Sequence, residues 1–473
     1  MKVKHWHRWP LWSLIGLLLL AACSTGGGEA AVSGGSEPVT VERAETEEEG
    51  ETAVSEPEQV AVEEATESPP ATAQVEEVPE EVANEAPETV EETAEEPTEV
   101  TEEDDPVAEN ETTGDDRSDR LRRLTIRWNT NWDLHIIDYD EILPGGPPRD
   151  GIPSVDNPQF ISVAEARNWL ADNEPVIALE LNGLARAYPL QILTWHEIVN
   201  DELGDTPVVV TFCPLCNSAL VFDSRVAGQA LEFGTSGLLR HSDLIMYDRT
   251  TESLWQQFTG EAIVGDMVGQ QLTFLPSSLV SFADFVAAYP DGEVLSRETG
   301  FESYAHRYGS NPYAGYDTVG RNPFLFDGEL DGRLQAVERV VTISFEDIDA
   351  AYPLRILSQV SVINDSPGGH DLVVFHNEGT SSALDTEVIS LGKDVGATGV
   401  FDPHVEGEKL TFIKESEGIV DEQTGSVWNV LGQAVDGPLA GTQLMPIVHG
   451  DHFWFSWAAF KPDTIIYGLD SQE

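Results

Sequence analysis

The chain has 473 residues and a formal net charge of −60, because 85 acidic residues outnumber 25 basic ones. Such an excess of negative charge argues against nucleic acid as a partner, since a protein that binds phosphate backbones neutralises them with Lys and Arg. After the N-terminal segments described below, about 350 residues remain for folded structure, which is enough for two domains.

The N-terminus has the pattern of a bacterial lipoprotein signal peptide. Three basic residues precede an apolar run over residues 11–22, which is too short to span a bilayer and has the length of a signal-peptide core. The run ends in L-A-A-C, a string that resembles the lipobox, in which the Cys is lipidated and becomes the mature N-terminus. We expect removal of residues 1–22 and lipidation of Cys23, so that the protein is extracytoplasmic, in the cell envelope, and lipid-anchored to a membrane. The alternative is an ordinary signal peptide with an incidental Cys.

Residues 23–120 form an acidic segment that we expect to be a disordered spacer. From residue 24 to residue 120 the chain has 33 acidic residues against three Arg, and no aromatic residue. A segment of this composition cannot bury enough apolar surface to offset the entropy of ordering it. Its charges repel one another and extend the chain, so the segment holds the following domain away from the membrane. Cation binding is the alternative, but the scattered carboxylates show no ligand spacing.

The composition changes at about residue 121, where Trp, Phe, Tyr and Gly become frequent. The string P-G-G-P-P-R-D-G-I-P predicts that loops occupy most of the chain up to residue 160. A helix over residues 162–170 is then predicted, with Ser162 as its N-cap and Glu165 at its third position.

A β-hairpin is predicted next. Residues 176–181 and 184–188 have the apolar and β-branched character of two strands, and the intervening Asn182-Gly183 fits a type I′ turn. This hairpin leads directly into the stretch that carries the reactive residues.

The stretch from residue 194 to residue 222 gathers the residue types that carry chemistry. His196 and Glu197 lie on a predicted short helix, and a β-branched strand follows them. Cys213 and Cys216 then occupy a tight C-P-L-C turn between that strand and the next one. If the protein has a chemical centre, we expect it in this stretch.

The chain repeats itself at a fixed offset of 164 residues. A-Y-P-L-Q-I-L at residue 187 returns as A-Y-P-L-R-I-L at 351, I-V-N-D at 198 returns as V-I-N-D at 362, and N-S-A-L at 217 returns as S-S-A-L at 381. Repeated strings indicate repeated structural units. We therefore predict a β-rich α+β fold with two pseudo-equivalent halves, residues 121–310 and 311–473, built of mainly antiparallel strands and short helices.

The second half keeps the scaffold motifs and lacks every reactive residue of the first. At the fixed offset, the reactive residues are replaced by Val360, Ser361, Asn377 and Thr380. Part of the segment Gly234–Tyr247 is also absent from the second half. The residues that only the first half has form the candidate site: His196, Glu197, Cys213, Cys216 and a predicted loop, Ser236–Met246, which begins with Ser236 and Gly237.

Several of these strings together resemble those of a known family. D-G-I-P at residue 150, A-Y-P-L, H-E-I-V-N-D, T-F-C-P-L-C-N-S, S-D-L-I-M-Y-D-R and G-D-H-F-W-F-S-W occur in this order, from about residue 128 to the C-terminus. The chain is similar to the domain-of-unknown-function family 3179, exported proteins of bacteria and archaea. The resemblance implies export but no particular activity. The family places Asn where His241 stands, which argues against His241 as an obligatory ligand.

The candidate site suits a metal ion. Two thiolates and an imidazole are ligands for Zn(II) or Cu(I), and a C-P-x-C turn between strands resembles the knuckle turns of zinc and iron sites. We predict that His196, Cys213 and Cys216 bind the ion. Glu197 stands beside them as a supporting group or a catalytic base. The candidates for the remaining ligand lie in the predicted loop and are Met246, which favours copper, His241, and Asp243, which favours zinc.

Three other interpretations of the same residues stay open. A plain disulfide between Cys213 and Cys216 is typical of exported proteins, but it closes a loop of about four residues and contributes only roughly 2 kcal/mol. Thiol–disulfide redox chemistry is the second, with His196 as its base, although the motif precedes a predicted strand rather than a helix. A hydrolase with Ser236 as its nucleophile is the third, and it lacks the context of a nucleophile elbow.

Overall fold

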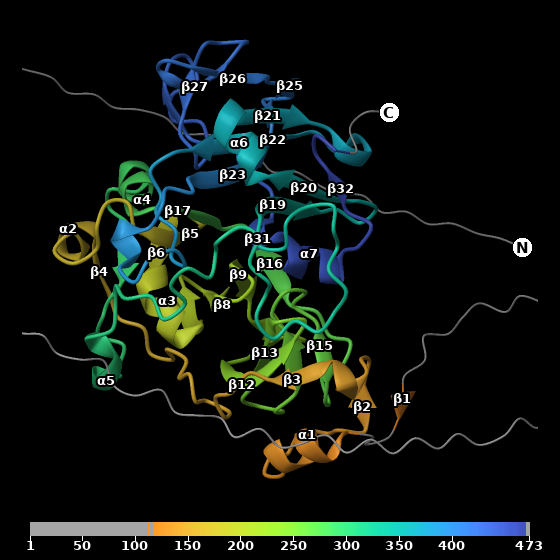
Figure 1. The fold of residues 1–473 in the computed structure, drawn as a ribbon. Helices are drawn as coiled ribbons and strands as arrows, with labels where there is room; N and C mark the ends of the chain where they lie inside the picture. The colour runs from red at the N-terminus through yellow and green to blue at the C-terminus, as the bar shows by residue number, and fades with distance from the viewer. Residues whose placement is uncertain (1–111, 114–116, 470–473) are drawn as a thin grey trace, which may run out of the picture. The chain divides into compact units, whose positions relative to one another are not determined.

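The computed structural model describes residues 112–113 and 117–469. The predictions for the signal peptide, for Cys23 and for the acidic segment, apart from residues 112–113 and 117–120, lie outside the described residues. In the part of the chain that is described, no helix has the length and apolar character needed to cross a membrane. Figure 1 shows how the elements named below are arranged.

The helices are short, as the sequence predicts. The predicted capping box is present, because the Ser162 side chain accepts a hydrogen bond from the Glu165 N–H and the Glu165 carboxylate accepts one from the Ser162 N–H. This helix ends at Ala166, earlier than predicted, and the next residues continue as hydrogen-bonded turns. The helices are α1 (Asp119–Leu124), α2 (Val163–Ala166), α3 (Leu190–His196), α4 (Phe282–Ala288), α5 (Glu302–Ala305), α6 (Leu354–Val360) and α7 (Trp454–Phe460), with 3-10 turns η1 (Tyr139–Glu141), η2 (Pro367–Gly369) and η3 (Ile389–Leu391).

The predicted hairpin is confirmed and forms the centre of a five-stranded sheet. Strands β5 (Pro175–Leu181) and β6 (Leu184–Pro189) are joined by Asn182 and Gly183, whose φ angles of 56° and 82° are those that a type I′ turn requires. The strand order is β17-β5-β6-β18-β4, in which β18 runs parallel to β6. The outer strands are β4 (Phe160–Ser162), β17 (Ser278–Ser281) and β18 (Glu293–Leu295).

The C-x-x-C turn belongs to a second sheet of four antiparallel strands, in the order β16-β9-β8-β7. Helix α3 leads into it, and β8 and β9 run antiparallel to each other on either side of the turn. The strands are β7 (Ile198–Leu203), β8 (Thr206–Cys213), β9 (Ser218–Asp223) and β16 (Thr273–Leu275).

A third sheet of seven strands carries the segment after the C-x-x-C stretch. Its order is β1-β2-β15-β14-β13-β12-β3. The strands are β1 (Thr112–Thr113), β2 (Leu134–His135), β3 (Ile142–Pro144), β12 (Phe233–Arg240), β13 (Asp243–Asp248), β14 (Leu254–Gln256) and β15 (Ala262–Val264). A small ribbon of β10 (Arg225–Val226) and β11 (Gln229–Ala230) lies directly before β12 in the chain.

The C-terminal part contains three further four-stranded sheets, in the orders β31-β19-β20-β32, β21-β22-β23-β30 and β26-β27-β28-β29. Their strands are β19 (Arg339–Ser344), β20 (Asp349–Pro353), β21 (Val362–Asp365), β22 (Leu372–Asn377), β23 (Ala397–Asp402), β26 (Phe412–Glu415), β27 (Gly418–Asp421), β28 (Val427–Trp428), β29 (Ala434–Asp436), β30 (Met445–Pro446), β31 (His449–Phe453) and β32 (Ile465–Ile466), beside a ribbon of β24 (His404–Val405) and β25 (Glu408–Lys409). The prediction of a β-rich fold with mainly antiparallel strands and short helices is confirmed.

Two kinds of side-chain hydrogen bond occur at corresponding places in the N-terminal and C-terminal sheets. The Tyr188 hydroxyl donates to Asp201, and the Tyr352 hydroxyl donates to Asp365, 164 residues further on. The indole N–H of Trp255 donates to Asp248 in the same way as that of Trp428 donates to Asp421. The parallel pair β6–β18 likewise has a counterpart in β20–β32.

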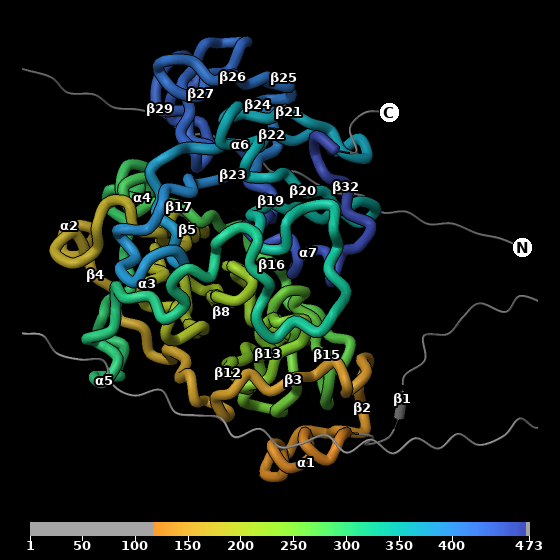
Figure 2. Tube along the Cα trace, viewed as in Figure 1, coloured from red at the N-terminus to blue at the C-terminus, as the bar shows by residue number. Residues whose placement is uncertain are grey.

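The largest core cluster draws on both parts of the chain. Val209 and Phe212 of β8 are fully buried in the same cluster as Trp454 of α7 and Ile466 of β32. Between the two parts, residues 296–338 run as a long connection with only the short helix α5, and Figure 2 shows this segment as a green-to-teal tube. Because the core is shared, each part depends on the other for burial of its apolar residues.

Candidate metal centre

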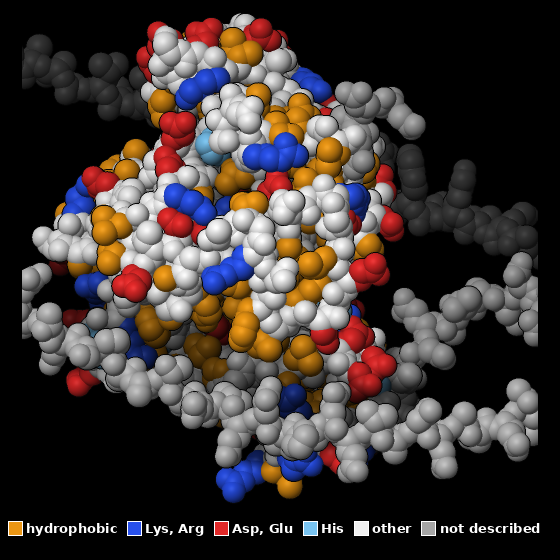
Figure 3. Space-filling view, in the orientation of Figure 1, with side chains coloured by type: hydrophobic (Ala, Val, Ile, Leu, Met, Phe, Trp, Pro, Cys, Tyr) orange, Lys and Arg blue, Asp and Glu red, His pale blue; other side chains and the backbone are white. Residues whose placement is uncertain are grey.

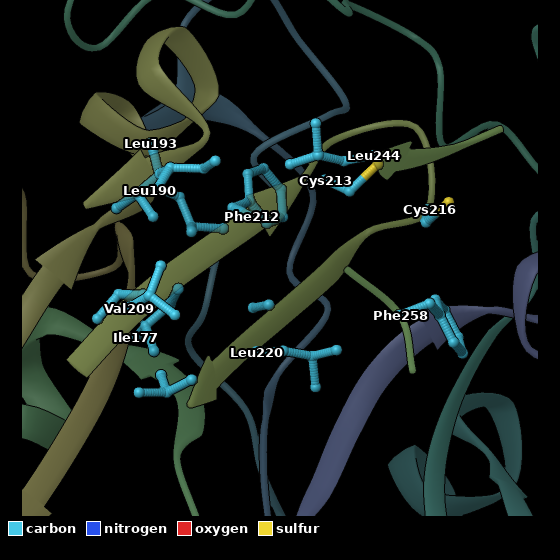
Figure 4. Close-up of a cluster of buried hydrophobic side chains, with 14 of the residues drawn as sticks. Ile177, Leu190, Leu193, Val209, Phe212, Cys213, Cys216, Leu220, Leu244 and Phe258 are labelled. Carbon is cyan, nitrogen blue, oxygen red and sulfur yellow. The ribbon is translucent and has the colours of Figure 1, made fainter. Parts of the chain in front are cut away.

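The turn between β8 and β9 brings the two thiols to one end of their sheet. β8 ends at Cys213, and the Cys216 N–H donates to the Cys213 carbonyl at 3.2 Å. Asn217 then has a φ of 51°, a backbone conformation that Asn tolerates better than most residues, before β9 begins. Figure 4 shows both sulfurs at this end of the strands, near Leu244 of β13.

The predicted loop Ser236–Met246 is in fact part of a paired β-hairpin. β12 and β13 are antiparallel, with Arg240 opposite Asp243, so that His241 and Ser242 form a two-residue turn with φ angles of 52° and 70°. Positive φ at both positions is the signature of a type I′ turn. The tip of this hairpin reaches the C-x-x-C turn, where the Ser242 carbonyl lies 3.8 Å from the Cys213 sulfur and accepts its S–H.

Three ligand-type groups converge where the turn and the hairpin meet. One ligand atom each of Cys213, Cys216 and Asp243 lies within 4.8 Å of the other two, and all three residues are buried. Among residues 112–113 and 117–469, no other set of three His, Cys, Asp or Glu residues gathers as closely. Cys213 and Cys216, two of the predicted ligands, therefore lie close to each other. Asp243, from the predicted loop Ser236–Met246, lies close to both.

The Asp243 carboxylate is only half satisfied by the protein. Its Oδ2 accepts hydrogen bonds from Gln256 Nε2 at 2.6 Å and from the Phe258 N–H at 3.0 Å. Its Oδ1 is buried and, by distance and angle, accepts no hydrogen bond, although the Cys213 and Cys216 thiols interact with the carboxyl and lower its pKa. An unsatisfied buried acceptor costs about 1–3 kcal/mol, so this oxygen fits a site that receives a cation. Other buried oxygens without a hydrogen-bond partner on neighbouring residues of these strands are Ser218 Oγ, Gln256 Oε1 and Gln257 Oε1.

Burial raises the pKa of every ionisable group at this place. Burial raises the pKa of Asp243 to about 7, and the pKa of the Cys213 thiol is also raised. Cys216 is affected more strongly, with a pKa well above its ordinary value, because burial and the neighbouring thiol both disfavour its anion. Without a cation, the site therefore holds protons at neutral pH. A bound metal ion replaces those protons, since thiols and carboxyls ligate in their deprotonated forms.

Glu197 lies next to this group as the residue that caps the C-terminus of α3. Its N–H donates to the Leu193 carbonyl at 2.7 Å, and its own carbonyl accepts from the Phe212 N–H at 2.8 Å. The residue has a φ of 58° and is 8% exposed. Burial and the charge of Asp243 raise the pKa of its carboxyl to about 8. A carboxyl that titrates near neutral pH has the property that a general base needs.

His196, predicted as a ligand, does not belong to the three-residue group. Its Nδ1 lies 2.7 Å from the Pro153 carbonyl, and its Nε2 lies 2.7 Å from the Tyr308 hydroxyl. The carbonyl can only accept, so Nδ1 carries the proton and Nε2 accepts from the hydroxyl. Burial lowers the pKa of this ring, which keeps it neutral. The two ring nitrogens thus form hydrogen bonds that hold Pro153 and Tyr308, which are far from α3 in the sequence, against this helix.

His241 and Met246, the other ligand candidates, also have structural surroundings. His241 stands in the hairpin turn, with Nε2 3.4 Å from Glu141 Oε2 and its ring against Phe460. Met246 is fully buried in the main core. Since side chains alternate along a strand, Met246 and Asp243, three residues apart on β13, project to opposite faces. Of the candidates on this strand, the Asp243 carboxylate is the one that groups with the two thiols within 4.8 Å.

Ser236 and Gly237 form an irregularity in β12 rather than a reactive loop. The register of β12 against β13 shifts between Thr235 and Leu238, which marks a β-bulge. The Ser236 hydroxyl is buried, donates to the Ile245 carbonyl and accepts from the Leu238 N–H. A hydroxyl that is bonded to two backbone groups and closed off from solvent has no access to a substrate. The hydrolase interpretation is therefore contradicted by the position of Ser236.

Two tyrosines that the sequence analysis did not single out stand near the site. Burial raises the pKa of Tyr313, and the charges of Glu197 and Cys213 add to this shift. Tyr316 lies edge-on to Phe453 and accepts a hydrogen bond from the Phe324 N–H at 3.1 Å. Both belong to the connection 296–338. The signal in the sequence is four Tyr within S-Y-A-H-R-Y-G-S-N-P-Y-A-G-Y, a density that a surface loop does not require.

The C-terminal part fixes the C-x-x-C turn from the other side. The Phe453 N–H donates to the Cys216 carbonyl at 2.9 Å, and Asn217 Nδ2 donates to the Asp451 carbonyl at 3.0 Å. The G-D-H-F-W-F-S-W string therefore positions the thiols.

Comparison with known proteins identifies one similarity. The family model described as a protein of unknown function (DUF3179) matches residues 149–464, about two thirds of the chain. No curated protein and no solved structure matches significantly. The matched region contains the complete Cys213, Cys216 and Asp243 group.

Proposed function

The chain belongs to the DUF3179 family of proteins of unknown function, and we propose from its own residues that it is a membrane-tethered, extracytoplasmic metal-binding protein. Cys213, Cys216 and Asp243 hold the ion. The observation that carries the proposal is the buried Asp243 Oδ1, which has no hydrogen-bond partner beside two buried thiols. A carboxylate in such surroundings stays charged only with a cation next to it.

Zn(II) fits this donor set better than Cu(I). Copper(I) favours thiolates and thioethers, whereas a carboxylate oxygen together with thiolates suits zinc. Three protein ligands leave one position for water or a substrate, the arrangement of catalytic rather than structural zinc. Zinc at this position lowers the pKa of a bound water and polarises carbonyl groups. Glu197, with its raised pKa, is the chain's own group that accepts a proton there.

The tether and the duplication are parts of the same proposal. The L-A-A-C string supports lipidation of Cys23 and a location in the cell envelope. The fixed offset of 164 residues, the matching strand orders β17-β5-β6-β18 and β31-β19-β20-β32, and the two Tyr–Asp hydrogen bonds support internal duplication of one unit. On this view the second copy kept its scaffold and lost the metal ligands.

The two other interpretations of the cysteines fit the site less well. Both thiols are free in the structure, and both are buried. Thiol–disulfide exchange requires an accessible thiolate with a lowered pKa, whereas burial raises the pKa of both thiols here. A disulfide would also leave Asp243 Oδ1 without a partner.

The test is elemental analysis of the chain after anaerobic purification, with three variants. We expect about one zinc per chain for the parent, which is the stoichiometry of a single site. Cys213→Ser and Asp243→Asn should each lose most of the metal. His196→Gln is the matched control, because its amide can still donate to the Pro153 carbonyl while it offers no imidazole. This variant should retain the metal.

The outcomes separate the alternatives. Loss of metal in His196→Gln, with an unchanged thermal transition, would restore His196 as a ligand. Copper in place of zinc would overturn the choice of metal. A reduced parent chain that contains no metal and takes up neither ion would overturn the proposal itself.

A further inference from the structure

A short basic segment stands out in this acidic chain. Residues 117–127 contain five Arg and one Asp, although the chain as a whole has a net charge of −60. Arg120, Arg123 and Arg127 are exposed, and none of them has an ion-pair partner among the described residues. In Figure 3, blue Lys and Arg atoms lie with orange apolar atoms at the lower edge of the face shown, where Figure 1 places α1.

Exposed apolar side chains accompany these arginines. Leu124 at the end of α1 is 52% exposed, and Ile126 two residues later is 78% exposed. The other face of α1 is fixed, because Leu121 is buried in a cluster with Trp132 and Tyr139. The fold therefore holds two large apolar side chains in solvent beside three guanidinium groups that have no ion-pair partner among the described residues.

A pocket of about 560 Å³ lies beside this surface. Arg123 and Arg127 line it together with Arg149, which is neutralised by an ion pair with Glu252 at 2.9 Å. The bulge of β12 contributes to its wall: Gly237 has a φ of 73°, and a Cβ at this position would lie 2.2 Å from the Pro147 carbonyl oxygen. The close contact of β12 with the Pro147 backbone thus shapes a cationic pocket with an apolar rim.

We propose that Arg120, Arg123, Arg127, Leu124 and Ile126, termed the docking patch, bind the surface of a membrane that contains anionic phospholipids. Arginine next to exposed aliphatic side chains is the composition of protein surfaces that insert at the lipid headgroup level. Each Arg close to an anionic bilayer contributes about 1 kcal/mol to binding. The pocket has the size of small-ligand sites and accepts a phosphate-bearing headgroup.

The position of the docking patch in the chain supports this partner. It begins where the acidic segment ends, so the folded part meets the membrane at the end from which its predicted tether leaves. The negative charge of the remaining chain is repelled by the same bilayer, which favours a single orientation. The docking patch does not include any of the metal-site residues and goes beyond the metal-binding proposal.

The test is vesicle sedimentation with the chain from residue 23 onward carrying Cys23→Ala, so that no lipid anchor contributes. We expect binding to phosphatidylglycerol vesicles, weak binding to phosphatidylcholine vesicles, and loss of binding at high salt. Arg123→Gln/Arg127→Gln should reduce the partition coefficient by about tenfold or more. Arg321→Gln/Lys414→Gln changes the net charge equally at exposed positions elsewhere and should leave it unchanged.

A second variant tests the apolar part without changing the charge. Leu124→Ser/Ile126→Ser should weaken binding to phosphatidylglycerol vesicles, whereas the salt dependence stays. An equal loss of vesicle binding in the Arg321→Gln/Lys414→Gln control would show that binding depends on net charge alone, and it would overturn the proposal. Complete competition by inorganic phosphate would show that the pocket binds a free anion rather than a lipid headgroup. Membrane binding seen only after deletion of residues 29–116 would show that the chain's own acidic segment occupies the docking patch. Either result also overturns the proposal.

Discussion

At the scale of single residues, the site is dominated by buried carboxyls that share one environment. Asp243 and Glu197 have raised pKa values, about 7 and about 8, because burial disfavours their charged forms. Neither lies in an ion pair with Lys or Arg in the described structure. The cost of ionising them is what a bound cation removes.

The first prediction concerns the pH dependence of the metal-free chain. Below its ordinary pKa of 4.5, Glu197 is protonated in both the folded and the unfolded state, and its contribution to stability is complete. As the pH rises toward about 8, the unfolded state releases the proton while the folded state retains it. Stability therefore falls across this range. Thermal unfolding in the presence of a chelator should show a falling Tm from pH 5 to pH 8.

Two variants make this prediction specific. Glu197→Gln cannot ionise, so the fall of Tm between the two pKa values should become shallower. Glu408→Gln, at an exposed position of β25, should keep the parent's slope. Identical slopes in all three chains would show that Glu197 is not the titrating group.

The structure brings some of the predicted site residues together and places others apart, for an identifiable reason. Cys213 and Cys216 are separated by two residues in a turn, so local chemistry alone places their sulfurs together. Asp243 was one of three candidates, and only the register of β13 distinguishes it from Met246. His196 is held by Pro153 and Tyr308, which are 43 and 112 residues away. No local pattern identifies such partners.

At the scale of elements, the hairpin β12–β13 carries a backbone constraint near the site. Its turn places His241 and Ser242 at positive φ, where Asn, Asp and Gly are favoured. The Asn182-Gly183 hairpin was predicted because its turn has the common sequence, whereas His-Ser gave no such signal and the segment was interpreted as a loop.

The second prediction tests this turn. His241→Asn should leave the metal content unchanged and the Tm equal or higher, because Asn tolerates positive φ better than His. His241→Val should lower the stability by roughly 1–3 kcal/mol, since a β-branched residue is strained in this conformation. Thermal unfolding and elemental analysis measure both effects. Loss of metal in His241→Asn would instead identify His241 as a ligand.

The third prediction compares two glycines with nearly equal φ angles, 73° at Gly237 and 77° at Gly269. A Cβ at Gly237 would lie 2.2 Å from the Pro147 carbonyl oxygen, whereas at Gly269 it meets nothing within 4 Å. Gly269→Ala should therefore cost only about 1 kcal/mol for the backbone conformation. Gly237→Ala should cost clearly more, because β12 must separate from the Pro147 backbone. Similar denaturant midpoints for the two variants would contradict the close contact between Gly237 and the Pro147 backbone.

At the scale of the whole molecule, the two parts that the sequence predicts as halves are not independent in their packing. The strand orders of the two parts are similar, but the main core contains Leu193 and Val209 together with Trp454 and Ile466. Residues 117–469 accordingly belong to one compact unit. The boundary predicted at residues 310–311 does not coincide with a separation of cores, because the offset of repeated strings carries no information about how the two parts pack.

The last prediction follows from this shared core. Leu193 is fully buried in α3, and Leu193→Ala should destabilise the chain by about 2–5 kcal/mol through the cavity that it leaves. If the core unfolds as one unit, amide hydrogen exchange should become faster in β22 of the C-terminal part by the same factor as in β8, and calorimetry should show one transition at a lower Tm. Leu391→Ala, at a side chain that is 73% exposed, is the matched control and should change neither. Faster exchange confined to β8 would mean that the N-terminal and C-terminal parts have separate stabilities, and that the contacts of Phe453 and Asp451 with the C-x-x-C turn do not couple them.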